Sequence, residues 1–262
     1  MSTSLPFFQV DAFASAPFTG NPAAVMPLDH WLDDATMQAI AAENNLSETA
    51  FTVPSTSHEV DYDLRWFTPT VEVDLCGHAT LASAHILIKG DRVRFSTRSG
   101  VLAVTRGEDG LLNLDLPAYP VVEGEEEGLL DALGVTGPIF LSRGGNGAAI
   151  VLLSDEAAVR AVSPDFTKLR KIDRLVIVTA PGDDHAVASR VFAAYHGIDE
   201  DPVTGSAHAA LTPFWADRLG RNRFTALQAS ARTGVIECEH QGERVVLGGR
   251  AVTVIEGYFQ IA

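Results

Sequence analysis

The chain has 262 residues, which allows one large domain or two ordinary ones, and its 46% hydrophobic content is typical of a globular protein. Its formal net charge of −15 argues against nucleic acid and anionic membranes as partners, because both are bound through Lys and Arg. No apolar run approaches a membrane span, and Met1–Val10 lacks the pattern of a signal peptide, so we expect a cytoplasmic protein. Two cysteines make no disulfide framework, and no His/Cys cluster has metal-ligand spacing, so we predict no metal.

The first half is predicted to contain strands and two helices. A helix over Ala35–Asn44, capped by Asp33 or Asp34, places Met37, Ile40 and Ala41 on one face. A second helix, Ala79–Ile88, is apolar all round, which is typical of a helix enclosed by a sheet. Alternating residues predict strands at Phe7–Phe13, Ala23–Met26, Leu46–Val53, His58–Phe67, Val93–Ser96, Val101–Thr105 and Asn113–Leu116.

The second half is predicted to begin after Pro117–Gly128, whose prolines and acidic run indicate a solvated boundary. Helices are predicted at Leu129–Leu133, Ala157–Ala161, Asp165–Lys171 and Ala207–Leu219, the last of them buried. Strands are predicted at Pro138–Ser142, Ala148–Leu153, Leu175–Thr179, Val187–Tyr195, Ala229–Glu239, Arg244–Gly249 and Val252–Gln260. Because no long helix follows each strand, a doubly wound sheet is not expected. We predict an α+β chain of two halves, 1–118 and 119–262, and leave open whether the C-terminal strands pack with the first half.

Two similar turns lie almost half a chain apart. Asp74–Ala82 and Asp201–Leu211 each run from an acidic residue through a glycine into a helix of small residues, and Gly77 aligns with Gly205. Such self-similarity indicates two pseudo-symmetric halves, each presenting a helix N-terminus to a shared cleft. Backbone N–H groups at helix starts lack partners within the helix and bind anions such as a substrate carboxylate.

The first turn and the segment before it supply three candidate residues. Glu48 has uncharged, partly apolar neighbours, so it is either a buried acid/base group or an exposed carboxylate at a helix–strand junction. His78 follows Gly77 at a helix start and is either a site residue or a capping or core histidine. Cys76 is either a thiolate favoured by the helix N-terminus or a small buried hydrophobic residue.

The second turn supplies Asp201 and Ser206. Asp201 precedes a proline, which holds it extended, and it either binds a substrate hydroxyl or amine or interacts with the helix dipole. Ser206 suits a hydrogen-bond donor to a carboxylate or a proton relay. It lacks the Gly-x-Ser-x-Gly context of a nucleophilic serine.

Taken together, the segments resemble the PhzF family of phenazine-biosynthesis isomerase-like proteins. The matching segments are spread over residues 11 to 208 in family order, and the chain length also fits. They are Asp11–Phe13 with Phe18–Pro22, Asn45–Phe51, Arg65–Pro69 with Glu72–Thr80, and Asp201–His208.

The resemblance implies a diaminopimelate-epimerase-like fold, in which each half rolls a sheet around a central helix and the active-site cleft lies between the halves. It also implies a homodimer without a cofactor and a small carboxylate-bearing substrate. The family's best-understood member moves a proton between ring carbons of a dihydro-hydroxyanthranilate. The matching catalytic positions are Glu48, His78 and Asp201, and the matching substrate-binding positions are Ser47, Cys76, Gly77, Gly205 and Ser206.

Three functions follow as hypotheses. The first is a PhzF-like isomerase in which Glu48 transfers the proton. The second is an amino-acid epimerase or racemase. Val203–Gly205 offers no second cysteine, which argues against a two-thiol mechanism and leaves one-base epimerisation open. The third is a binding protein without activity, which a large separation of Glu48 from His78 and Asp201 would favour.

Overall fold

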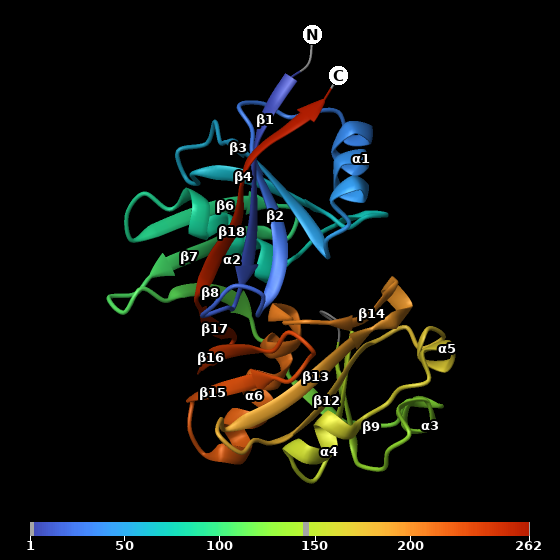
Figure 1. Cartoon of the computed structure of the whole chain (residues 1–262). Coiled ribbons are helices and arrows are strands. Elements are labelled where there is room, and N and C mark those ends of the chain that lie inside the picture. Colours follow the sequence, from blue (N-terminus) through green and yellow to red (C-terminus); the bar gives the residue numbers. More distant parts are fainter. Residues whose placement is uncertain (1–2, 144–146, 262) are drawn as a thin grey trace. The chain divides into compact units, whose positions relative to one another are not determined.

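The computed structural model of the chain describes residues 3–143 and 147–261 (Figure 1). It divides into two compact units, Met1–Asp115 with Gly248–Ala262, and Leu116–Leu247. The division therefore falls three residues before the predicted boundary. The last strand, β18 (Ala251–Ile261), belongs to the first unit, a possibility that the sequence left open.

In the described residues, unit 1 combines a sheet with two helices, α1 (Asp34–Asn44) and α2 (Gly77–Leu87). The sheet pairs β18 with β1, β1 with β2, β2 with β3, β3 with β4, β4 with β5 and β6, and β6 through β7 to β8. The pairs β2–β3 and β4–β6 are parallel and the others antiparallel. The strands are β1 (Thr3–Ala12), β2 (Asn21–Pro27), β3 (Glu48–Pro54), β4 (Tyr62–Phe67), β5 (Glu72–Val73), β6 (Arg92–Thr97), β7 (Gly100–Arg106) and β8 (Leu112–Pro117).

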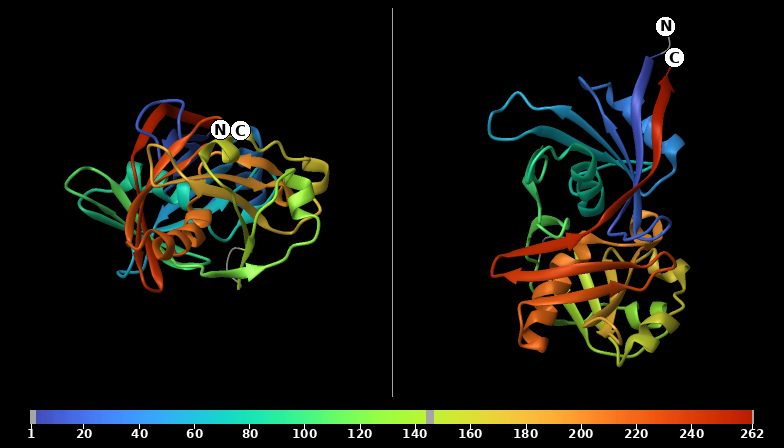
Figure 2. Two further views of the ribbon diagram at one scale, coloured as in Figure 1. Left: turned by 90° about the horizontal axis from the view of Figure 1, so that it is seen from below. Right: turned by 60° about the vertical axis from the view of Figure 1, so that its left-hand side comes forward.

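Helix α2 is the buried centre of unit 1, and it contacts β1, β2, β3 and β18 (Figure 2). Its residues from Gly77 to Ala84 are all buried. Two polar residues among them are satisfied within the helix, since the hydroxyls of Thr80 and Ser83 donate to the carbonyls four residues earlier, at 2.5 and 2.7 Å. Small side chains and internally satisfied hydroxyls allow the sheet to approach this helix closely.

Helix α1 covers another part of the same sheet. It begins at the predicted cap, where an Asp33 carboxylate oxygen accepts a hydrogen bond from the Thr36 N–H at 2.9 Å. The predicted inner face is confirmed, because Met37, Ile40 and Ala41 are buried in a cluster with apolar residues of β2, β3 and β4.

Unit 2 contains the strands β9 to β17 and a second buried helix, α6 (Gly205–Leu219). The shorter helices are α3 (Leu129–Leu133), α4 (Glu156–Ala161), α5 (Phe166–Leu169) and the 3₁₀ turn η1 (Ala194–His196). The strands are β9 (Val121–Gly124), β10 (Ile139–Ser142), β11 (Ala148–Leu152), β12 (Leu175–Pro181), β13 (Val187–Ala193), β14 (Ile198–Asp201), β15 (Arg223–Gln228), β16 (Gly234–Gln241) and β17 (Arg244–Gly249). Strand β13 is a junction, antiparallel to β12 and β14 and parallel to β15.

The structure corrects three predicted segments of unit 2. The expected boundary Pro117–Gly128 contains β9, which pairs with β10. Tyr195 lies in η1 and not in the preceding strand. The strand predicted at Ala229–Glu239 begins only at Gly234, because Thr233 has a φ of 55° and its N–H donates to the Ser230 carbonyl in a turn. The strand before that turn, β15, was missed.

Candidate functional site

In unit 1, the first residue of β3 meets the first turn of α2. His78 Nε2 lies 3.1 Å from Glu48 Oε2, and the two side chains are only 4% and 12% exposed. On the other side of the ring, His78 Nδ1 lies 3.6 Å from Cys76 Sγ and 3.2 Å from Asn21 Nδ2. The structure therefore brings together Glu48, Cys76 and His78, which were all predicted, and adds Asn21.

The parallel pairing of β2 and β3 explains this arrangement. Ala23 is the register partner of Glu48, so Asn21, the first residue of β2, lies near the start of β3. Helix α2 packs across both strands and directs its N-terminus to the same place. Asn21 had been quoted only as part of the Phe18–Pro22 match. A buried asparagine between a glycine and a proline was the signal that could have identified it.

Charge and burial act in opposite directions on His78. Burial disfavours the imidazolium, but the negative charges of Cys76, when ionised, and of Glu48 outweigh it and raise the pKa of His78. Burial, with the Glu48 charge, raises the pKa of Cys76 to about 11, so its thiol is protonated at neutral pH. With a protonated Cys76, the Glu48 charge alone opposes the effect of burial, so the upward shift of the His78 pKa is smaller. The thiolate alternative for Cys76 is therefore disfavoured.

Asn21 determines which nitrogen of His78 carries the hydrogen. If the Asn21 amide nitrogen donates to Nδ1, the neutral ring has its hydrogen on Nε2. The charged ring has a hydrogen on both nitrogens, so the Asn21 amide nitrogen no longer donates to Nδ1, and the Nδ1–H has Cys76 Sγ at 3.6 Å as its acceptor. In both states the N–H therefore faces Glu48, in a contact that functions as an ion pair when the ring is charged. The contact counts as an ion pair and not as a hydrogen bond.

A metal is a further possibility that the sequence did not suggest. Among the described residues, Glu48, Cys76 and His78 form a group whose potential ligand atoms lie within 4.8 Å of one another. However, Glu48 and Cys76 face opposite nitrogens of one imidazole. An ion bound to one nitrogen would have the other ligand across the ring, so the arrangement suits proton transfer better than coordination.

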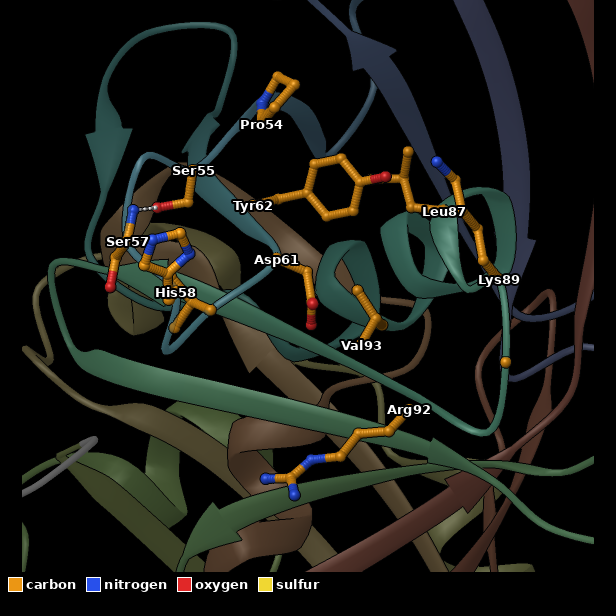
Figure 3. Close-up of a pocket in the computed structure, with 12 residues that line it drawn as sticks. Pro54, Ser55, Ser57, His58, Asp61, Tyr62, Leu87, Lys89, Arg92 and Val93 are labelled. Carbon is orange, nitrogen blue, oxygen red and sulfur yellow. Dashed lines mark hydrogen bonds between the residues drawn. The ribbon is translucent and has the colours of Figure 1, made fainter.

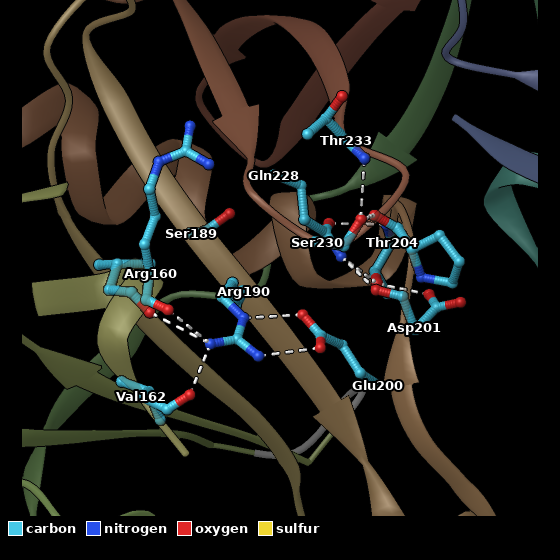
Figure 4. A network of polar contacts seen from close by, with 12 residues as sticks. Arg160, Val162, Ser189, Arg190, Glu200, Asp201, Thr204, Gln228, Ser230 and Thr233 are labelled. Carbon is cyan, nitrogen blue, oxygen red and sulfur yellow. Dashed lines mark hydrogen bonds and ion pairs between the residues drawn. The ribbon is translucent and has the colours of Figure 1, made fainter. Parts of the chain in front are cut away.

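In unit 2, three consecutive acidic residues at the end of β14 have different partners, and Figure 4 shows those of Glu200 and Asp201. Asp199 forms an ion pair with Arg170 at 2.6 Å, and Glu200 binds Arg190 through both oxygens at 2.8 and 2.9 Å. Asp201 is buried and accepts a hydrogen bond from the Thr204 hydroxyl. Arginines therefore pair with the first two acids, whereas Asp201, the predicted site residue, contacts Thr204.

Gln228, the last residue of β15, stabilises the turn between Asp201 and α6 through hydrogen bonds. It is completely buried, and its amide hydrogen-bonds to Thr204 and to the Asp201 carbonyl. The sequence prediction missed both Thr204 and Gln228. No local pattern could have revealed Gln228, because its partners are 24 and 27 residues away.

The starts of α2 and α6 have the same local structure. The cap residues Cys76 and Thr204 are both extended, with φ of −144° and −119°, and neither side chain caps its helix. Gly77 and Gly205 follow them and are buried. In the part of the chain that the structure describes, neither cap residue therefore supplies the side-chain oxygen that usually binds the first N–H groups.

The remaining predicted residues lie beside these groups. Ser47 is half-buried directly before β3, and Ser206 is half-buried in the first turn of α6. His208, one turn further along α6, is a core residue. Burial lowers its pKa to about 4, and its neutral ring donates from Nδ1 to the Thr204 carbonyl at 2.8 Å.

Unit 1 also has a cavity of about 520 Å³ near the β3–β4 loop (Figure 3). Its lining includes His58, Asp61, Tyr62, Lys89 and Arg92. It lies by the C-terminal ends of β3 and α2, whereas Glu48 and His78 occupy their N-terminal ends. It is therefore separate from the Glu48–His78 group.

Comparison with known proteins identifies the family. The family model described as phenazine biosynthesis-like protein (PhzC-PhzF) matches residues 10–257. The chain belongs to the PhzF family. An uncharacterized isomerase of Pseudomonas aeruginosa is 50% identical over 97% of this chain and 98% of its own length. The crystal structure of a PhzF-family phenazine biosynthesis protein from Enterococcus faecalis superposes with a TM-score of 0.90 at 43% identity, covering 98% and 99% of the two chains.

The fold extends beyond this family. A hydroxyproline epimerase from Agrobacterium vitis, with bound trans-4-hydroxy-L-proline, has a TM-score of 0.63 at 12% identity, covering 98% of this chain and 93% of that one. The predicted diaminopimelate-epimerase-like fold is thereby confirmed for this PhzF-family chain. Among the residues that the structure describes, no helix is long and apolar enough to cross a bilayer.

Proposed function

We propose that this protein is an isomerase that moves a proton between carbon atoms of a small carboxylate-bearing metabolite, with Glu48 as the acid/base group. The observation that carries the proposal is the buried contact between Glu48 Oε2 and His78 Nε2 at 3.1 Å. A carboxylate so placed is oriented by its neighbour through Oε2, and the side chain keeps 12% of its surface exposed, where a substrate carbon acid can approach it.

In this proposal, His78 stabilises negative charge on the substrate and Asp201 helps to bind it. The contact with Glu48 favours the protonated ring of His78, and a positive charge there stabilises negative charge as it develops on the substrate. Asp201 offers a carboxylate oxygen to a substrate hydroxyl or amine. One carboxylate, Glu48, can take the proton from one carbon and return it to another where water is excluded.

The uncapped starts of α2 and α6 are the proposed binding groups for the substrate carboxylate, together with Ser47 and Ser206. Helix N-termini favour anions, and here neither cap side chain competes for their N–H groups. From the family resemblance, we also propose that the protein acts in the cytoplasm as a homodimer without a cofactor.

A two-thiol racemase is the less favoured function. Such a mechanism needs one thiolate and one thiol on opposite faces of a carbon acid, and Cys76 is a protonated thiol in the first half with no cysteine in the aligned segment of the second. Epimerisation by Glu48 alone differs from the proposed isomerisation only in where the proton returns.

Solvent-deuterium incorporation followed by proton NMR tests the proposal. The protein is incubated in heavy water with a panel of small carboxylates that includes dihydro-hydroxyanthranilate and proteinogenic amino acids. We expect deuterium at one carbon of a responding compound, and a rate reduced about 10²–10⁴-fold in Glu48→Gln, since the amide cannot transfer the proton.

Glu43→Gln, which changes an exposed glutamate of α1, is the matched control and should exchange at the wild-type rate. Deuterium at an amino-acid Cα, with inversion, would identify an epimerase. Exchange that persists at full rate in folded Glu48→Gln would refute the role of Glu48.

A further inference from the structure

The amide of Gln228 makes three hydrogen bonds at the start of α6. Its Oε1 accepts from the Thr204 N–H at 2.8 Å. Its Nε2 donates to the Asp201 carbonyl at 2.7 Å and to the Thr204 hydroxyl oxygen at 3.1 Å. The side chain is completely buried, and Figure 4 shows it beside Thr204 and Asp201.

Backbone groups determine the orientation of this amide. If the amide were turned over, its nitrogen would face the Thr204 N–H and its oxygen would face the Asp201 carbonyl, so both contacts would be repulsive. The amide nitrogen must therefore point at the Thr204 hydroxyl oxygen. That hydroxyl receives a hydrogen from Gln228 and directs its own hydrogen to the Asp201 carboxylate.

These hydrogen bonds of the Thr204 hydroxyl affect the capping of α6. Threonine is a favoured N-cap residue because its oxygen accepts a hydrogen bond from the second or third N–H of the helix, here that of Ser206 or Ala207. Thr204 occupies the cap position and makes no such bond. Its oxygen is held on Gln228 and Asp201 instead, which keeps it away from the helix N–H groups.

We propose that Gln228 is a positioning residue that prevents Thr204 from capping α6, so that the helix start remains available to the substrate carboxylate. The inference rests on the proposed function for its carboxylate ligand. It acts through Thr204 and involves no contact between Gln228 and the substrate. Ser230 supports the same turn, since its hydroxyl donates to the Pro202 carbonyl at 2.8 Å.

The test uses the full chain and anthranilate as a carboxylate probe, with binding followed by amide NMR. Gln228→Met keeps the length and flexibility of the side chain but removes all three hydrogen bonds. We expect anthranilate to bind about tenfold more weakly, the cost of losing one hydrogen bond to a charged group. We also expect the Ala207 amide to exchange more slowly with solvent, because the released Thr204 hydroxyl caps it.

The double variant Gln228→Met/Thr204→Val separates positioning from general damage. Valine has nearly the shape of threonine but no hydroxyl, so it cannot cap the helix. We expect the second change to restore most of the affinity lost in Gln228→Met and to remove the extra amide protection. Thr204→Val alone should bind the probe within about threefold of wild type.

Additive losses in the double variant, or unchanged protection at Ala207 in Gln228→Met, would overturn the proposal. If the wild-type protein bound no carboxylate and exchanged no substrate proton, the proposed function would fail. The amide protection of the variants would still report whether Gln228 controls Thr204. Should Gln228→Met not fold, Gln228→Glu retains the acceptor for the Thr204 N–H and loses the donors, so the same two measurements apply to it.

Discussion

At the scale of single residues, the two buried histidines respond to pH in opposite ways. His78 lies against a carboxylate that raises its pKa, whereas His208 is enclosed by apolar groups and its pKa is lowered to about 4. The aligned helix starts thus carry one histidine suited to charge and one kept neutral. A histidine that can carry a positive charge can stabilise a negatively charged substrate, so His78 is the better candidate for a site residue.

His208 predicts an acid-sensitive contribution to stability. Above pH 6.5 its ring is neutral in both the folded and unfolded chains. As the pH falls from 6.5 to about 4, the unfolded chain binds the proton first, so stability is lost, by an amount on the order of 3 kcal/mol in all. Urea unfolding of wild type and His208→Gln across this range measures the effect, because glutamine does not titrate. The difference between the two free energies should be constant above pH 7 and shrink below 6.5, and a constant difference throughout would contradict the assignment.

The sequence predicted the site residues unevenly. Glu48 and His78 could be found because the motifs that contain them are local, and the structure places their side chains in contact. Cys76 was left open as a thiolate because a helix start favours one, yet complete burial has the larger effect on its pKa. Thr204 and Gln228 act through hydrogen bonds between distant segments, which no spacing in one sequence reveals.

At the scale of elements, the turn between β1 and β2 supports the site through Asn21. Gly20, in this turn, has a φ of 66°, and a Cβ there would lie 2.2 Å from the Ala12 carbonyl oxygen. Gly220, after α6, has a φ of 65° with open space around the same position. The two glycines have the same backbone conformation, but a Cβ would clash with the backbone only at Gly20.

Alanine substitution at these glycines separates backbone strain from steric clash. Gly220→Ala should cost about 1 kcal/mol, from the left-handed conformation alone. Gly20→Ala should cost more and also shift the NMR signals of His78, because the backbone must move next to Asn21. Chemical denaturation and histidine-selective NMR measure both effects. Equal costs with unchanged His78 signals would indicate that the turn relaxes without moving Asn21.

The buried helices were predicted well, whereas β15 was missed, as were β9 and β14. Both α2 and α6 are runs of small apolar residues between a glycine and a change of composition, so their burial follows from the sequence. In β15 the inward positions are Phe224, Ala226 and Gln228. A buried glutamine breaks the apolar alternation that identifies a strand. The prediction therefore failed at the residue to which we assign a positioning role.

At the scale of the whole molecule, the chain leaves unit 1 at Asp115 and returns to it at Gly248. The returning strand β18 pairs with β1 along its whole length, and Thr3 is the register partner of Ile261 (Figure 1). Unit 1 therefore needs both ends of the sequence, whereas unit 2 is built from one continuous segment. A sequence-based boundary that assigns 119–262 to the second half cannot represent this return.

Moving β18 within the chain tests whether its pairing or its connection to unit 2 matters. In one variant, residues 248–261 are placed before Thr3 through a two-residue Asn-Gly turn, giving the order 248–261, turn, 3–247. Because β1 and β18 are antiparallel neighbours, a hairpin turn can join them without disturbing the sheet. We expect this permuted chain to fold with native amide protection in β1 and α2.

The matched variant, residues 3–247 without β18, should lose protection in unit 1 and keep it in β12, β13 and α6, since the core of unit 2 receives no residue from β18. Hydrogen exchange followed by mass spectrometry distinguishes the two. Loss of unit 1 in the permuted chain as well would mean that the covalent link at residues 247 and 248 is required, and that pairing with β1 is not enough.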